Sequence, residues 1–111
     1  MKTARMFKFR IRPGMEQAYA DYLRDVVTPI DAVAHKADVF RELVTVMPDG
    51  ETSWNHGRLF IFRDAAQRDA FAAGMADAAA AFDGSEAAKV KRKAYAETLR
   101  KQVAVSDYTL S

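Results

Sequence analysis

The sequence has no cysteine, only two histidines and only three prolines among its 111 residues. Without thiols there can be no disulfide framework and no thiolate metal site. Two histidines that lack a fixed spacing to a carboxylate fall short of a metal ligand set, so we expect neither a metal nor a bound cofactor. The lack of cysteine is compatible with a cytoplasmic protein.

The sequence also lacks a large net charge and a long apolar run. Seventeen Lys and Arg residues against fifteen Asp and Glu leave a formal charge of +2, which is too small to indicate nucleic-acid or membrane binding. The first residues, "MKTARMFKFRIR", alternate cations with apolar side chains, unlike a signal peptide or membrane span. The length predicts a single domain over residues 1–111.

The first half of the sequence shows a change from strand to helix periodicity. Residues 5–12, "RMFKFRIR", alternate strictly, which predicts a strand. After Pro13 and Gly14, apolar residues recur at three- and four-residue steps from Met15 to Val33, which predicts a long helix. Because proline is disfavoured inside helices, we expect a kink or restart with Thr28 as the cap and Pro29 in the first turn.

The second half predicts a hairpin, helices and a last strand. Residues 38–47 and 55–62 read as strands on either side of the turn formed by residues 48–50. Asp64 is expected to cap a helix that continues to an interruption at residues 83–85. A basic helix from Glu86 to about Lys101 follows, and the segment at 102–110 alternates as a strand.

This order of elements predicts an α+β, ferredoxin-like fold with an antiparallel four-stranded sheet and helices on one face. Alternation assigns one set of side chains to the helix-covered face: Phe7, Phe9, Ile11, Leu59, Ile61, Val103 and Val105. It assigns another set to the opposite face: Met6, Lys8, Arg10, His56, Arg58, Phe60, Phe62 and Tyr108. Large aromatic residues in the second set predict an apolar patch that another surface covers.

The layout resembles a known superfamily. "RPGMEQAYADYL", the break at 28–30, the hairpin turn at 48–50 and "RDAAQRDAFA" are similar to the dimeric α/β-barrel superfamily, close in layout to antibiotic-biosynthesis monooxygenases. The resemblance covers nearly the whole chain. It implies a homodimeric α/β barrel in which two sheets pack face to face and each protomer keeps a ligand cavity.

The stretch Trp54, Asn55 and His56 contains the residue types that haem-degrading members of this superfamily use. In those enzymes the three residues come from separate elements, whereas here they are consecutive, and neighbouring strand residues point to opposite faces. We therefore interpret Trp54 as packing at the mouth of the strand and Asn55 as supporting the turn. His35, near a helix end, is expected to face solvent.

His56 and Arg58 are the candidate catalytic residues, because two residues spaced by two on a strand point the same way. His56 would act as a base and Arg58 would stabilise an anion. We expect Lys8, Arg10, Trp54, Phe60, Phe62 and Tyr108 to contact the ligand, since the cations and aromatics suit a small anionic or aromatic compound. Pairing of the three cations with acids such as Glu42 is the alternative.

The expected function is binding of such a compound, with cofactor-independent monooxygenation of an aromatic or enolisable anion as the leading activity. A polyketide cyclase or isomerase that uses the same His56 is one alternative. A non-catalytic stress-response or ligand-binding dimer is another. No nucleic-acid or membrane partner is expected.

Overall fold

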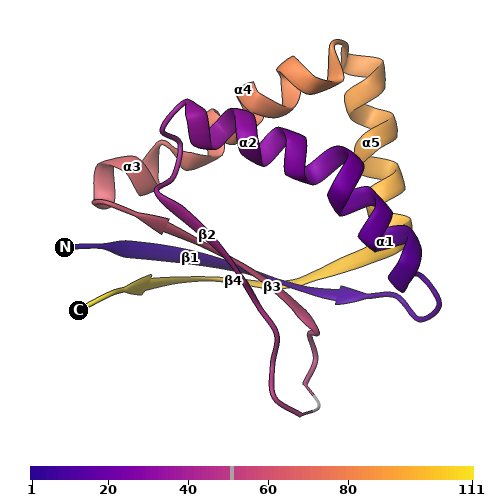
Figure 1. Cartoon of the computed structure of the whole chain (residues 1–111), viewed down its shortest axis with the longest axis horizontal. Coiled ribbons are helices and arrows are strands. Elements are labelled where there is room, and N and C mark those ends of the chain that lie inside the picture. The colour runs from indigo at the N-terminus through magenta and orange to yellow at the C-terminus, as the bar shows by residue number, and fades with distance from the viewer. Residues whose placement is uncertain (51) are drawn as a thin grey trace.

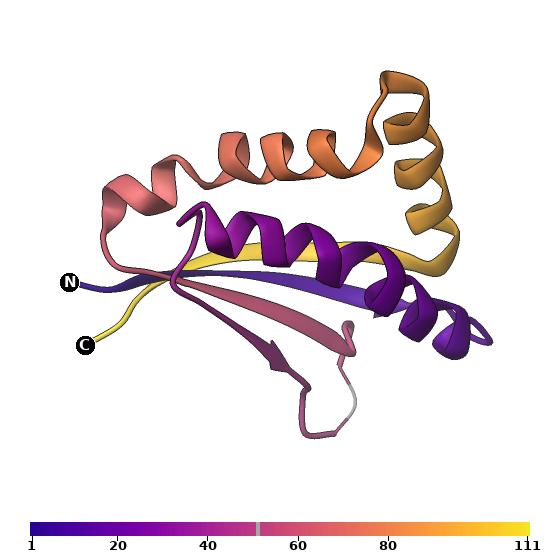
Figure 2. The ribbon, with the colours of Figure 1, turned by 45° about the horizontal axis from the view of Figure 1, so that its top comes forward.

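The computed structural model describes residues 1–50 and 52–111; Glu51, in the predicted hairpin loop, lies outside the described residues. A four-stranded antiparallel sheet has the strand order β2, β3, β1, β4. All the helices lie on one face of this sheet, and the other face is open (Figures 1 and 2). The strands are β1 (Thr3–Ile11), β2 (Glu42–Val46), β3 (His56–Phe62) and β4 (Arg100–Thr109). The fold class is therefore the predicted one, α+β and ferredoxin-like.

The first long helix forms as predicted, but it passes residue 28 without a break. It runs through α1 (Glu16–Tyr22), the π-helical turn η1 (Leu23–Val27) and α2 (Thr28–Lys36). Pro29 lies in the first turn of α2, as expected, but Thr28 makes no side-chain cap and the backbone stays helical. The prediction of a capped restart was wrong because a wider turn accommodates the proline: the Thr28 amide bonds to the Leu23 carbonyl, five residues back.

The second helical region divides into three elements, α3 (Ala65–Asp69), α4 (Phe71–Asp83) and α5 (Glu86–Leu99). Asp64 caps α3 as predicted, accepting a hydrogen bond from the Gln67 amide. Gly84, in the left-handed conformation with φ 76°, ends α4. Ser85 then accepts a hydrogen bond from the Ala88 amide and caps α5. The chain therefore turns sharply at Gly84, and α5 descends to β4 (Figure 2).

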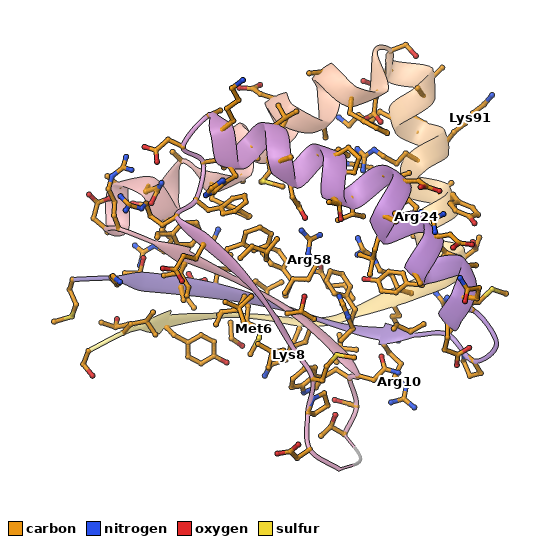
Figure 3. All side chains as sticks on the ribbon, in the orientation of Figure 1. Met6, Lys8, Arg10, Arg24, Arg58 and Lys91 are labelled. Atoms are coloured by element: carbon orange, nitrogen blue, oxygen red, sulfur yellow. The ribbon has the colours of Figure 1, made fainter. Side chains whose placement is uncertain are left out.

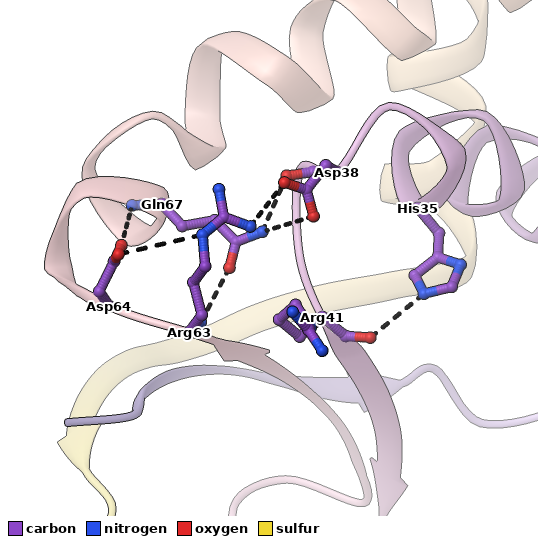
Figure 4. Close-up of polar contacts among 6 residues, drawn as sticks. All are labelled: His35, Asp38, Arg41, Arg63, Asp64 and Gln67. Carbon is purple, nitrogen blue, oxygen red and sulfur yellow. Dashed lines mark hydrogen bonds and ion pairs between the residues drawn. The ribbon is translucent and has the colours of Figure 1, made fainter.

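Strand β2 is shorter than predicted because the chain first makes a turn at Asp38. Asp38 is left-handed, with φ 62°. Its backbone carbonyl accepts a hydrogen bond from the Gln67 side chain, which also accepts one from the Arg63 amide (Figure 4). The Asp38 carboxylate pairs with Arg63 at 2.5 Å. These contacts tie the end of α2 to the start of α3.

The pairing of β1 with β3 corrects the predicted faces of β3. Phe9 is opposite His56, and Phe7 is opposite Arg58, so each of these pairs shares a face. The even-numbered residues of β3 therefore lie under the helices, and Leu59 and Ile61 lie on the open face. The alternation could not settle this because residues 59–62, "LFIF", are all apolar and carry no period-2 signal.

Two groups of buried side chains connect the helices to the covered face. One joins α2 and α4 to the aromatic residues of β3 and of the segment before β2. It includes Ile30, Ala34, Phe40, Phe60, Phe62 and Phe71. The other joins the α1–η1 segment to α5 and includes Tyr19, Tyr22, Val27, Ala96 and Leu99. Between these two groups, the helices and the sheet form a cavity that is partly open to solvent.

Candidate functional site

The cavity lies between the covered face of the sheet and the helices and has a volume of about 670 Å³. This is within the usual range for small-molecule sites. Phe7, Phe9 and Phe60 form its base on the sheet, and Phe71 and Met75 line it from α4. The phenyl rings of Phe60 and Phe71 have centroids 4.7 Å apart. An aromatic ligand would therefore find an apolar, aromatic surface here.

An ion pair between Arg58 and Asp31 lies in the wall of this cavity. Arg58 Nη2 donates to both carboxylate oxygens of Asp31 at 2.6 Å. Both side chains are largely buried, with exposures of 12% and 13%. Burial raises the pKa of the Asp31 carboxyl above its ordinary value, although Arg58 and Arg100 act in the opposite direction. Asp31 is therefore a more basic carboxylate than usual and is held beside a guanidinium.

His56 is buried next to the cavity, on the covered face and not on the open face where it was predicted. Its ring packs edge-on against Tyr19, with centroids 5.2 Å apart. Burial lowers the pKa of His56 to about 4, and the charges of Arg58 and Arg100 act in the same direction. A neutral imidazole of such low basicity is a poor proton acceptor near pH 7.

Arg100, at the start of β4, completes this part of the site. Its guanidinium carbon lies 4.1 Å from the centroid of the Phe9 ring, and its Nη1 donates to the Tyr19 hydroxyl at 3.1 Å. Arg100 also lines the cavity. These contacts fix a second guanidinium in the wall that contains Arg58.

Helix α5 contributes a row of charged residues to the cavity: Glu86, Lys89, Arg92 and Lys93. Arg92 forms two hydrogen bonds with the Asp83 carboxylate, at 2.8 and 3.1 Å, and the Asp83 side chain is only 3% exposed. Five cationic residues and two acidic residues line the cavity in total. The site is therefore electropositive as well as aromatic.

The register divides the predicted ligand residues between the two faces of the sheet. Arg58, Phe60 and Phe62 lie on the covered face, where Phe62 is fully buried. Lys8 and Arg10 lie on the open face, away from Arg58 (Figure 3). Tyr108, which is opposite Ala4 in the register, lies on the open face as well. The prediction that Lys8, Arg10 and Arg58 share a face was therefore wrong, because it rested on the wrong phase for β3.

The consecutive Trp54, Asn55 and His56 diverge in space. Trp54 is beside Lys8, whose Nζ is 5.3 Å from the indole centroid. Asn55 bridges to β1: its amide donates to the Phe9 carbonyl, and its Oδ1 accepts from the Ile11 amide. Asn55 thus holds the start of β3 against β1, and the three residues do not converge on one site.

His35 and the metal and membrane expectations are the remaining features to compare with the structure. His35 is exposed and its Nε2 lies 3.1 Å from the Arg41 carbonyl (Figure 4). In residues 1–50 and 52–111, no group of three His, Asp or Glu side chains is placed to hold a metal ion. No helix in these ranges has the length and apolar character needed to cross a membrane.

Asp31 is one of the residues of this site that the sequence prediction missed. It follows Ile30 and lies four residues after Val27, on the buried stripe of the first long helix. A carboxylate on such a stripe needs a partner when it is buried. The position of Asp31 on this stripe was therefore the signal in the sequence that could have identified it as a site residue.

Comparison with known proteins supports the fold and goes no further. No family model and no curated protein sequence matches the chain. HapK from Hahella chejuensis has a similar structure, with a TM-score of 0.60 and 11% identity over 100% of this chain and 93% of that one. A dimeric ferredoxin-like protein of unknown function from Jannaschia sp. matches with a TM-score of 0.59 and 16% identity over 99% and 100%. A variant of SnoaB, a cofactor-independent oxygenase from Streptomyces nogalater, matches with a TM-score of 0.56 and 10% identity over 98% and 92%. The chain thus has the fold of the dimeric ferredoxin-like proteins.

Proposed function

We propose that the protein binds a small aromatic, enolisable compound in the covered cavity and removes a proton from it. The observation that carries this proposal is the Asp31–Arg58 pair in the wall of an aromatic-lined cavity of about 670 Å³. A carboxylate beside a guanidinium combines a proton acceptor with a group that stabilises the anion formed.

The proton transfer can be written from the geometry. An O–H or C–H bond of the ligand breaks, the proton moves to a carboxylate oxygen of Asp31, and the electron pair stays on the ligand as an enolate or phenolate. Arg58 has five N–H donors, and the bonds to Asp31 use only Nη2. Among residues 1–50 and 52–111 its other donors have no hydrogen-bond partner, so they can bind the developing oxyanion.

Two fates of this anion correspond to two activities. In a cofactor-independent monooxygenase, the anion of a methylene compound reacts with O₂; one oxygen atom becomes the new carbonyl and the other leaves as water, so the ligand supplies all the electrons. The likeness to the oxygenase SnoaB supports this activity. In a cyclase or isomerase, the proton returns to another carbon without oxygen. The raised pKa of Asp31 favours this second activity, because the same group would accept and then return the proton.

The active form is proposed to be a homodimer that packs through the open face of the sheet. This face carries Met6, Leu59 and Ile61, together with Val44 and Tyr108, which are 41% and 40% exposed. An apolar sheet face of this kind is unusual for a monomer. Two structurally similar proteins are described as dimeric, which supports the proposal.

The test is hydrogen exchange of 2-tetralone, an aromatic ketone with acidic methylene hydrogens, in D₂O. The protein should accelerate deuterium incorporation in the absence of oxygen, and Asp31→Asn should lose at least about a hundredfold of this acceleration, the low end for a general base. Asp77→Asn is the matched control, because Asp77 is exposed on α4 and the variant loses the same charge.

Oxygen measurements then separate the activities. Uptake of one O₂ per ketone consumed supports the monooxygenase, and exchange or rearrangement without uptake supports the isomerase or cyclase. Tight binding of 2-tetralone without exchange or uptake would contradict both activities and favour the non-catalytic ligand-binding alternative.

A further inference from the structure

Two lysines of α5, Lys89 and Lys93, line the cavity. Arg58 is paired with Asp31, and Arg92 is paired with Asp83. Within the ranges that the structure describes, no carboxylate lies within 4.0 Å of the ammonium group of Lys89 or Lys93. Lys89 is half-buried, so its charge is partly removed from water, whereas Lys93 is exposed. The two lysines are four residues apart, and like charges at this spacing repel one another.

The position of Lys89 in α5 adds to this cost. It is the fourth residue of the helix, where the partial positive charge of the helix N-terminus disfavours a cation. Lys91, by contrast, points away from the protein into solvent (Figure 3). A cation near the N-terminus of the helix, turned toward a cavity and lacking a carboxylate partner, is stabilised when an anion enters that cavity.

The lysines and the Asp31–Arg58 pair lie on different walls of the same cavity. Asp31 belongs to α2, whereas Lys89 and Lys93 belong to α5, and Phe7, Phe9 and Phe60 form the base. A ligand that contacted both walls would carry a reacting oxygen toward Asp31 and a separate charged group toward α5, with its aromatic part over the phenyl rings.

We propose that Lys89 and Lys93 form an anion subsite, which binds a permanently charged carboxylate of the ligand while the enol or phenol of the same molecule lies at Asp31. This inference rests on the proposed function and narrows its substrate class to aromatic hydroxy or keto acids. Neutral phenols and ketones would enter the same cavity with lower affinity.

The experiment compares 2-naphthol with 6-hydroxy-2-naphthoate, two probes that differ by one carboxylate, in calorimetric titrations of the full chain. The parent protein should bind the hydroxynaphthoate more tightly than the naphthol. Lys89→Gln/Lys93→Gln should reduce this preference by roughly tenfold, the scale of one charge-assisted hydrogen bond. Its affinity for 2-naphthol should stay within about twofold of the parent value, because 2-naphthol has no carboxylate for the two lysines to bind.

The matched control is Lys36→Gln/Lys91→Gln, which removes the same net charge from exposed positions that do not line the cavity and should keep the preference. Equal preference in both double variants would overturn the subsite while leaving the binding of 2-naphthol, and so the proposed function, intact. Failure of the parent protein to bind either probe would overturn the proposed function and the subsite together.

Discussion

The two faces of the sheet are built from the same strands but differ in what their polar residues do. On the covered face, Arg58 is held by a buried carboxylate and His56 is buried with a depressed pKa. On the open face, Lys8 lies against Trp54 and Arg10 reaches a backbone carbonyl at 3.3 Å. The covered face therefore places charges where water is scarce, and the open face presents an apolar surface with charged residues beside it.

The largest expected difference between the faces is in the free energy of unfolding after one cation is removed from each face. Arg58→Leu leaves the Asp31 carboxylate buried without its partner, which should lower the free energy of unfolding by about 3–5 kcal/mol. Lys8→Leu on the open face should change it by less than about 1 kcal/mol. Urea denaturation measures both. The double variant Arg58→Leu/Asp31→Leu should recover most of the loss, and a loss as large as that of Arg58→Leu alone would contradict the ion-pair explanation.

The pH dependence of the free energy of unfolding should reveal the contribution of His56. Its pKa is about 4 in the folded protein against an ordinary 6.5, so the folded state binds fewer protons than the unfolded state between these values. The stabilisation is complete above about pH 6.5 and is lost as the pH falls toward 4, by up to about 3 kcal/mol.

Denaturation curves at several pH values, compared with those of His56→Gln, isolate this contribution from that of Asp31, whose raised pKa acts with the opposite sign. Tyr19, Arg58 and Arg100 surround His56 and remain unchanged in the variant. Parallel pH profiles for the two proteins would show that His56 is not buried as described.

A charge introduced on the open face should weaken dimerisation. Leu59→Glu places a carboxylate in the proposed interface and should weaken dimerisation at least about a hundredfold, or about 2.7 kcal/mol. Sedimentation at micromolar concentration should give a dimer for the parent protein and a monomer for the variant. Glu42→Gln, at an exposed position of the same face, serves as the control. A parent protein that sediments as a monomer would contradict the proposed dimer.

The smallest loss of stability is expected for a substitution of Gly57 in β3. A Cβ at this position would lie 3.0 Å from Trp54 and from the Val46 carbonyl oxygen, and 3.1 Å from the Met6 sulfur. Gly57→Ala should therefore cost about 1–2 kcal/mol, because these groups must move. Thermal unfolding measures the loss. An unchanged melting temperature would mean that Trp54 does not pack over β3.

The sequence predicted the order of strands and helices because most of them carry a clear period, such as residues 5–12 and the stripe from Met15 to Val33. It did not predict the phase of β3, because four consecutive apolar residues fit either face. The π-helical turn before Pro29 was missed because periodicity does not distinguish a break in a helix from a wider turn.

The candidate site was predicted in part. Arg58 and Phe60 line the cavity, whereas Lys8 and Arg10 do not share its face. Asp31 was not predicted, and Lys89 and Arg92 were expected to lie on a solvated basic face of the last helix, so neither was assigned to the site. All three fall on inward stripes: Asp31 follows Val27 by four residues, and Arg92 and Lys89 precede the buried Ala96 by four and seven. Charged residues at such positions are a usable signal for a polar cavity.

The central claim is that the ligand binds on the covered face of the sheet. A crystal structure of the protein with 6-hydroxy-2-naphthoate tests it most directly. We expect the rings to lie over Phe7 and Phe60 beneath α4, with the hydroxyl within hydrogen-bonding distance of Asp31 or Arg58. A probe found on the open face, stacked on Trp54 beside Lys8 while the covered cavity stays empty, would contradict the account.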